Sequence, residues 1–317
     1  MQKLKQTIPA IRLKITGRCN RSCFFCNQEG DMKHINDMKN DNQFLEVVNN
    51  VTKAVCIKRI MLSGGEPLLN HDLDLIIETL ATIYPTVSLT TNGIKLLSKN
   101  AWSNLAAKGL SKVIMSIHCL TPEDFLYLEE IKKTLSWAKK SLSNQKNNIT
   151  NIAMIDLPLR INIVVYDDFR KTLNTIEELL LIQNRINFEI RLLNNLSDIA
   201  VSQATIKKLI NYLQVKEVDA YQRSGSSNVT KLYQTNSGQK LSIKIAYPYY
   251  LKSVCAGCNL LKNCHEGFYG IRLEKRKSEY FVRLCIYKQT SDVLMPYNKF
   301  LASDLPKEIR KMIKAEI

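Results

Sequence analysis

Strand-like and helix-like stretches alternate through the first two hundred residues, and this alternation limits the possible folds more than any other feature of the chain. Short runs rich in apolar and β-branched residues predict strands at 11–16, 59–63, 87–91, 112–117, 159–165 and 187–192. Apolar residues at helical spacing predict helices near 41–55, 71–83, 95–107, 122–143, 168–184 and 202–214. Six such units in succession predict an α/β fold in which helices cover a parallel sheet.

The pattern changes after about residue 215. A stretch rich in Ser, Gly and Asn at 224–228 predicts a flexible connection, and segments 229–235 and 240–246 flank a turn that predicts a hairpin. Residues 304–315 predict a closing amphipathic helix. We therefore divide the chain into a first domain of residues 1–215 and a smaller second domain of residues 216–317.

The chain is strongly basic, with 45 Lys and Arg, 29 Asp and Glu, and a formal net charge of +16. Two interpretations stay open: an anionic partner, or lysine-rich helix faces that are simply solvated. Residues 1–28 favour an anionic partner, because they carry six basic residues and no acid. The chain has no run of eighteen apolar residues and no apolar signal stretch, so we expect a cytoplasmic protein without a membrane partner.

The nine cysteines fall into two groups, with Cys56 and Cys119 standing alone. In a chain expected in the cytosol, such grouping indicates metal binding rather than disulfides. The first group is Cys19, Cys23 and Cys26, spaced C-x3-C-x2-C directly after the first predicted strand. Three thiolates can hold three irons of a cubane, and the fourth iron then stays open to a small molecule with an amine and a carboxylate.

Zinc and unrelated cysteines are the alternatives for this first group. A structural zinc site requires four ligands, and His34 is the nearest candidate for the fourth. The position of the motif at the end of a strand, where barrel and open-sheet enzymes place their sites, favours a catalytic cluster.

The first cysteine motif resembles the signature of the radical S-adenosylmethionine (SAM) superfamily. The resemblance implies that Cys19, Cys23 and Cys26 bind a [4Fe-4S] cluster and that Phe25 packs beside the adenine of SAM. Further along the chain, the segment Ser63-Gly64-Gly65-Glu66-Pro67 resembles the family's GGEP segment, which contacts the SAM amino group. Thr91-Asn92-Gly93 and Ser116 fall where the family places further SAM contacts. In this family the fold is a partial (βα)6 TIM-like barrel, here expected over residues 1–215.

The second group of cysteines comprises Cys255, Cys258, Cys264 and Cys285. A four-cysteine zinc site is the main alternative on ligand chemistry alone. The region also resembles the C-terminal cluster domain of the GTP 3′,8-cyclases of molybdenum cofactor biosynthesis and, more loosely, SPASM and twitch domains. That resemblance implies a second, auxiliary [4Fe-4S] cluster in a small C-terminal iron–sulfur domain.

Resemblance to the cyclases covers most of the chain, and it places Arg12 and Arg160 at positions that meet an anionic substrate. Three differences indicate another substrate. Cys264 is a fourth cysteine where the cyclases use three, Asn70 and His71 replace expected basic residues, and the final residues lack the cyclases' Gly-Gly.

His118 and Cys119 follow the fourth predicted strand, and they are either catalytic or substrate-binding residues or a satisfied pair at the strand end. Cys56, at the end of a predicted helix, is expected in the core.

We expect a radical SAM enzyme that cleaves SAM reductively and abstracts hydrogen from an anionic small molecule. A nucleotide or phosphorylated metabolite that undergoes cyclisation or rearrangement is the expected substrate, and a flavodoxin or ferredoxin the expected reductant. One alternative is a peptide maturase of SPASM type, which the absence of a leader-binding domain before the barrel disfavours. The other is a zinc or iron–sulfur protein that binds nucleic acid, which would explain the charge but not the GGEP segment.

Overall fold

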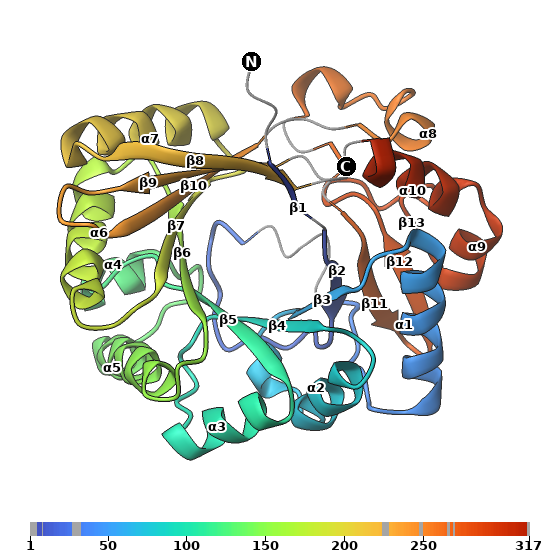
Figure 1. Cartoon of the computed structure of the whole chain (residues 1–317), viewed down its shortest axis with the longest axis horizontal. Coiled ribbons are helices and arrows are strands. Elements are labelled where there is room, and N and C mark those ends of the chain that lie inside the picture. The colour runs from blue at the N-terminus through green and yellow to red at the C-terminus, as the bar shows by residue number, and fades with distance from the viewer. Residues whose placement is uncertain are drawn as a thin grey trace.

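The computed structural model describes residues 5–7, 9–26, 33–223, 228–246, 250–264, 267–268 and 270–315. Six parallel strands lie side by side in chain order: β2 (Ile11–Lys14), β3 (Arg59–Ser63), β4 (Thr86–Thr91), β5 (Leu110–Ser116), β6 (Leu159–Val165) and β7 (Glu189–Asn194). The helices between them lie outside the curved sheet (Figure 1): α1 (Asn42–Val55), α2 (Leu73–Ala81), α3 (Lys99–Ala107), α4 (Pro122–Tyr127), α5 (Leu135–Ala153), α6 (Phe169–Gln183) and α7 (Ile199–Leu213). The predicted α/β fold, a partial barrel of six units, is confirmed.

Strand alternation separates the apolar outside of the barrel from its polar inside. In β2 the buried side chains of Ile11 and Leu13 belong to the main hydrophobic core, whereas Arg12 lines the barrel cavity. In β3, Ile60 and Leu62 likewise belong to the core. Successive side chains of a strand point to opposite faces, so one strand can serve both the core and the cavity.

Helix α1 shows how the sequence sets a boundary. The Asp41 side chain caps its start by accepting a hydrogen bond from the Phe44 N–H at 2.7 Å. Its end is Cys56, which takes a left-handed conformation with φ 58° and is exposed. The prediction that Cys56 lies in the core is therefore wrong, because the residue caps the helix instead of continuing its apolar face.

The strands after residue 215, together with β1 from the start of the chain, extend the same sheet at both edges. On one side, β10 (Lys240–Ala246) pairs parallel with β7 and is followed outward by β9 (Asn228–Gln234), β8 (Lys216–Arg223) and β1 (Lys5–Thr7). On the other, β11 (Arg272–Arg276) pairs parallel with β2 and is followed by β12 (Glu279–Arg283) and β13 (Leu294–Pro296). The hairpin predicted over 229–246 is confirmed as β9 and β10, while the domain boundary stays a prediction.

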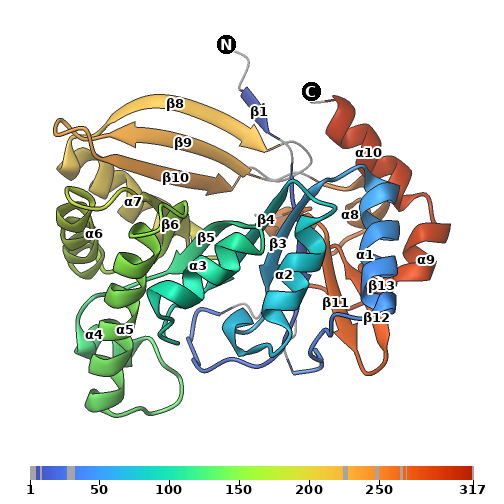
Figure 2. The same ribbon diagram turned by 60° about the horizontal axis from the view of Figure 1, so that its bottom comes forward.

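The C-terminal helices close the molecule beside α1. Helices α9 (Tyr297–Ala302) and α10 (Leu305–Ala315) contact α1 (Figure 2), so the predicted closing helix is confirmed. Short helical turns complete the structure at η2 (Pro67–Leu69), α8 (Lys252–Cys255) and η3 (Leu261–Asn263). No helix within the described ranges is long and apolar enough to cross a bilayer.

The single helix predicted at 122–143 is wrong. Helix α4 ends at Tyr127 and α5 begins at Leu135, after the side chain of Thr134 caps it by accepting from the Trp137 N–H. The residues between the two helices bond to the cysteine loop instead, with the Glu130 N–H donating to the Ser22 carbonyl at 2.7 Å. A tertiary contact therefore outweighs local helix propensity here.

Candidate active site

A cavity of about 360 Å³ occupies the inside of the barrel. Nine of the residues predicted to hold a cluster, SAM or substrate line it together: Cys19, Cys23, Phe25, Cys26, Gly64, Gly65, Asn92, Ser116 and His118. The two predicted substrate arginines, Arg12 and Arg160, line the same cavity. The structure thus gathers residues that follow or end four strands into one site.

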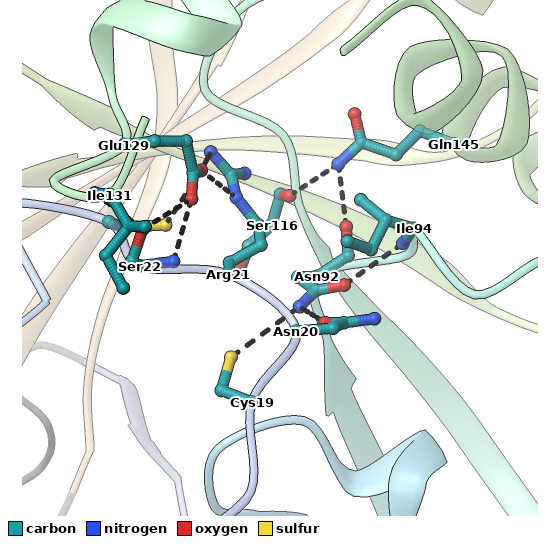
Figure 3. A network of polar contacts seen from close by, with 11 residues as sticks. Cys19, Asn20, Arg21, Ser22, Asn92, Ile94, Ser116, Glu129, Ile131 and Gln145 are labelled. Atoms are coloured by element: carbon teal, nitrogen blue, oxygen red, sulfur yellow. Dashed lines mark hydrogen bonds and ion pairs between the residues drawn. The ribbon is translucent and has the colours of Figure 1, made fainter. Parts of the chain in front are cut away.

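The cysteine loop is held against the segment between α4 and α5 (Figure 3). The carboxylate of Glu129 accepts hydrogen bonds from Arg21 Nε at 2.7 Å and from the Ser22 N–H at 2.7 Å. The side chains of Arg21 and Glu129 are 2% and 1% exposed, so this is a buried ion pair. It fixes the loop between Cys19 and Cys23, and neither Arg21 nor Glu129 was expected from the sequence to take part in the site.

Gly64 and Gly65 are required by backbone packing. A Cβ atom on Gly64 would lie 2.3 Å from the Thr16 carbonyl oxygen, and one on Gly65 would lie 2.1 Å from the Arg18 carbonyl oxygen. The Gly65 N–H donates to the Thr16 carbonyl at 2.8 Å. Both glycines line the cavity, and the close approach that needs them is to the loop after β2.

Glu66 lies behind the cavity wall and is fully buried. Its carboxylate accepts from Thr91 Oγ1 at 2.6 Å and from the Asn92 N–H at 2.6 Å. Burial raises the pKa of Glu66, against the lowering effect of these hydrogen bonds. Glu66 thereby positions Asn92, while a contact of the GGEP segment with the SAM amino group stays a prediction.

Gln145 on α5 joins the ends of β4 and β5 (Figure 3). Its side-chain amide donates to the carbonyl of Asn92 at 2.6 Å and to that of Ser116 at 3.3 Å. The side chain of Asn92 in turn donates to Asn20 Oδ1 at 2.8 Å, next to Cys19. Gln145 was missed from the sequence, although a polar residue on the buried face of an amphipathic helix was an available signal.

His118 is held as a neutral ring in the cavity wall. Its Nδ1 accepts a hydrogen bond from the Val164 N–H at 3.1 Å, and its ring centroid lies 4.8 Å from that of Phe25. Burial lowers the pKa of His118 to about 3. Cys119 is buried beside a neighbouring hollow, and burial raises the pKa of its thiol to about 12. This makes Cys119 a poor nucleophile, whereas His118 presents Nε2–H as a hydrogen-bond donor.

Positive charge dominates the cavity wall. The lining residues that the structure describes include six cations and no carboxylate: Arg12, Arg21, Arg160, Arg191, Lys244 and Arg272. Outside the wall, Glu189 lies 2.6 Å from Arg191 Nη2 and 4.0 Å from Arg160 Nη1. Burial would raise the pKa of Glu189, but the neighbouring arginines and Lys112 lower it to about 2. Arg191, Lys244 and Arg272 were not identified from the sequence, since only the folded sheet turns them inward.

The cavity wall also contains buried polar atoms that lack a hydrogen-bond partner among the described residues. Ser63 Oγ, Asn162 Oδ1 and Asn194 Oδ1 are buried and have no hydrogen-bond partner within the described part of the chain. Buried polar groups in folded proteins are nearly always satisfied, so unpaired atoms facing a cavity indicate that a bound molecule completes them.

The second cysteine group gathers around a small apolar pocket lined by Cys255, Cys258, Cys264 and Cys285. Backbone N–H groups donate to two of the sulfurs: Gly267 to Cys264 at 3.2 Å, and Tyr287 to Cys285 at 3.4 Å. Such N–H donors stabilise thiolates. Within the described ranges, however, no three His, Cys, Asp or Glu side chains are grouped closely enough to hold a metal ion.

The two cysteine groups lie at opposite ends of the barrel. Strand β11 runs parallel to β2 with Arg272 beside Arg12, so the residues just before β11 lie where β2 begins. The first group follows the end of β2. Gly270 and Ile271 line the barrel cavity while Gly267 and Phe268 line the small pocket, so one short segment separates the two spaces.

A family model described as the radical SAM superfamily matches residues 13–180. The chain belongs to the radical SAM superfamily. It is therefore a member of an enzyme family that uses SAM with a [4Fe-4S] cluster.

The curated relatives that we compared carry the name "Probable GTP 3′,8-cyclase". The protein of Methanothermobacter marburgensis is 31% identical over 51% of this chain, which spans only about half (50%) of that relative's length. The protein of Sulfurisphaera tokodaii is 26% identical over 92% of this chain and 86% of its own length.

Solved structures of the superfamily share the fold. His-tagged anSMEcpe with bound SAM aligns with 97% of this chain and 84% of its own, at a TM-score of 0.56 and 14% identity. Streptococcus suis SuiB bound to its precursor peptide aligns with 65% of this chain and 46% of its own, at a TM-score of 0.50 and 16% identity.

Proposed function

We propose that this protein cleaves SAM reductively at a [4Fe-4S] cluster held by Cys19, Cys23 and Cys26, and that the reaction acts on a small anionic substrate in the barrel cavity. The observation that carries the proposal is one cavity that contains both the three thiols and six cations without a described carboxylate. When bound, the cluster and SAM supply a 5′-deoxyadenosyl radical that abstracts hydrogen from the substrate.

In this proposal, residues of the chain bind SAM and the substrate and orient them. Asn92, fixed by Glu66 and Gln145, presents its side chain between the cysteine loop and the cavity. Phe25 and His118 form an aromatic edge against which a planar base can pack. His118 donates a hydrogen bond through Nε2–H and does not accept a proton, because the pKa of the buried ring lies near 3.

The second cysteine group is proposed to hold an auxiliary [4Fe-4S] cluster with Cys255, Cys258, Cys264 and Cys285 as ligands. Four thiols leave no open iron, so such a cluster would carry electrons or hold structure rather than bind substrate. Its position across a short segment from the basic cavity would place substrate between the two clusters.

The proposed substrate is a nucleotide or another phosphorylated metabolite. The cyclase-like relatives suggest this class, and the inward-facing arginines suit phosphate oxygens. Asn70 stands where a basic residue is expected from the cyclases, and it has a structural role here. Its side-chain amide donates to the carbonyls of Ile15 at 2.7 Å and Met38 at 3.0 Å. The cations proposed to bind substrate therefore differ from those of the cyclases.

Iron, labile sulfide and 5′-deoxyadenosine measured after anaerobic reconstitution test the proposal. Wild type should hold about eight irons per chain and form 5′-deoxyadenosine with dithionite, and the Cys19/Cys23/Cys26 triple alanine variant should hold about four and form none. Cys56→Ala is the matched control, since it removes an exposed cysteine that caps α1.

Normal turnover in the triple variant, or zinc without labile sulfide in wild type, would refute the proposal. Nucleotides and uncharged nucleosides are then compared as stimulants of 5′-deoxyadenosine formation. No stimulation by any phosphorylated compound would remove the proposed substrate class while leaving the radical chemistry in place.

A further inference from the structure

A second hollow of about 540 Å³ lies beside the barrel cavity, where strands β5, β6 and β7 lead into helices α4, α6 and α7. His118 and Asn195 line both spaces, so the hollow adjoins the cavity that contains the cysteine loop. The floor of the hollow is closed, because Cys119 and Leu128 in its wall are each 3% exposed. Its volume falls in the range of small-molecule sites, about 300–1,000 Å³.

The hollow is acidic, unlike the barrel cavity. Among the described residues, its wall carries four carboxylates and one lysine: Asp124, Asp167, Asp168, Asp198 and Lys171. Lys171 Nζ lies 3.1 Å from Asp124 and 3.9 Å from Asp168. No cation in the described part of the chain forms an ion pair with Asp167 or Asp198. Since the whole chain has a formal charge of +16, a cation is attracted to this hollow by its local charge and not by the net charge of the molecule.

Aromatic rings form another part of the wall. The centre of the Phe24 ring lies 5.9 Å from that of Tyr127 and 5.6 Å from that of Tyr166. The Nζ atom of Lys171 lies 4.4 Å from the centre of the Tyr127 ring. Lys171 therefore already places one ammonium group between an aromatic ring and the carboxylate of Asp124 in this hollow. The faces of aromatic rings attract cations, so the wall as a whole suits positively charged groups.

Tyr166 adds a polar atom that lacks a partner. Its hydroxyl is buried and has no hydrogen-bond partner among the residues that the structure describes. Burial raises the pKa of Tyr166, so the phenol stays neutral and its oxygen can accept a hydrogen bond from an ammonium group. Buried polar groups are nearly always satisfied, so this unpaired hydroxyl indicates that a bound molecule supplies the donor.

The carboxylates of the hollow are spread around it and do not converge on one point. Nowhere in the described ranges are three His, Cys, Asp or Glu side chains grouped closely enough to hold a metal ion. Separated carboxylates with aromatic rings between them suit a flexible molecule that has more than one cationic group, because its methylene segments can pack on the rings.

We propose that this acidic hollow binds a small aliphatic amine with two or more ammonium groups. The ammonium groups lie against Asp167 and Asp198, one of them donates to the Tyr166 hydroxyl, and the carbon chain packs on the Phe24 ring. This site is separate from the basic barrel cavity, and it does not depend on the proposed radical chemistry.

Calorimetric titration of the reconstituted protein with spermidine at low salt tests the proposal. Wild type should bind about one spermidine per chain, and a neutral diol of similar length should not bind. Asp167→Asn/Asp198→Asn should weaken spermidine binding by about tenfold or more. Asp198 caps α7 by accepting from the Val201 N–H, and asparagine caps helices as well, so the variant should keep its fold.

Tyr166→Phe removes only the unpaired hydroxyl and should weaken spermidine binding by about threefold or more. The matched control is Glu279→Gln/Asp304→Asn, which removes two exposed carboxylates outside the hollow. This control variant should bind spermidine as wild type does.

No saturable binding by wild type, or unchanged binding in either hollow variant, would overturn the proposal. An equal loss in the control variant would also overturn it. Displacement of spermidine by SAM would assign the hollow to the SAM site instead, and tighter binding of a trilysine peptide would assign it to a basic protein partner. None of these measurements uses SAM cleavage, so failure of the proposed function would leave the test of this site intact.

Discussion

Arg21 and Glu129, 108 positions apart in the chain, form a buried ion pair with Nη2 and Oε1 separated by 2.7 Å. The guanidinium carbon of Arg21 also lies 4.1 Å from the centre of the Phe125 ring. A loop that must present three thiols to a cluster is thus anchored at its middle by one arginine.

Removing one partner of this pair should be costly. Glu129→Ala leaves Arg21 buried and uncompensated, so we expect the free energy of unfolding of the apoprotein to fall by about 3–5 kcal/mol. Arg21→Met/Glu129→Leu should recover part of that loss, because no buried charge remains. Denaturant unfolding measures both. Asp304→Asn, which removes an exposed ion pair with Lys307, should change little, and an equal effect of Asp304→Asn and Glu129→Ala would contradict the assignment.

The glycine contacts predict different tolerance at two positions. Gly65→Ala forces a methyl group against the Arg18 carbonyl, and we expect a loss of about 1–3 kcal/mol in unfolding free energy together with weaker SAM binding. Gly257→Ala has nothing within 4 Å of the added carbon and should leave the stability of the apoprotein unchanged. Thermal unfolding of the two variants checks this, and similar melting temperatures would show that the loops after β2 and β3 are not packed as described.

Gln145→Leu removes the donor that the Asn92 and Ser116 carbonyls share. Two strand-end carbonyls then lose their partner, so we expect the KM for SAM to rise about tenfold with a smaller change in kcat. Asn151→Ala removes one bond to the Leu97 carbonyl from the same helix. It should cost stability only, and an equal rise in its KM would show that the effect of Gln145 is not local to the strand ends.

Glu189 predicts an acid-sensitive contribution to stability. The pKa of its folded-state carboxyl is about 2, against 4.5 for the ordinary group, so the contribution is complete above pH 4.5 and is lost as pH falls toward 2. The shift corresponds to roughly 3 kcal/mol at most. The difference in unfolding free energy between wild type and Glu189→Gln should therefore shrink between pH 4.5 and 2. Glu178→Gln, at an exposed pair with Lys146, should give a curve parallel to wild type; a constant difference for Glu189→Gln would refute the shift.

The number of cysteines in the second group predicts a spectroscopic outcome. Cys264→Ser should alter the electron paramagnetic resonance signal of the auxiliary cluster while dithionite-driven SAM cleavage stays largely intact, because Cys264 lies in the small pocket and not in the barrel cavity. Loss of SAM cleavage comparable to that of Cys19→Ala would mean that the two groups are not separate sites.

The sequence by itself determined the six βα units and the first cysteine motif, because both depend on local spacing. Apolar periodicity indicates which stretches become strands, and the C-x3-C-x2-C spacing places three cysteines on one short loop. The GGEP segment could also be identified from the sequence, since two adjacent glycines indicate a close approach of the backbone to another group. In the structure that group is the backbone of the loop after β2.

Only the tertiary structure decided which distant residues serve the site. Glu129 and Gln145 act on the cysteine loop and on the strand ends across 108 and 53 positions, and no local pattern encodes such contacts. The same holds for Arg191 and Lys244, whose strands pair in the sheet and turn both residues into the cavity. The placement of the two cysteine groups at opposite ends of the barrel followed from β11 pairing parallel with β2, because strand order depends on global packing and not on the strands' own sequences.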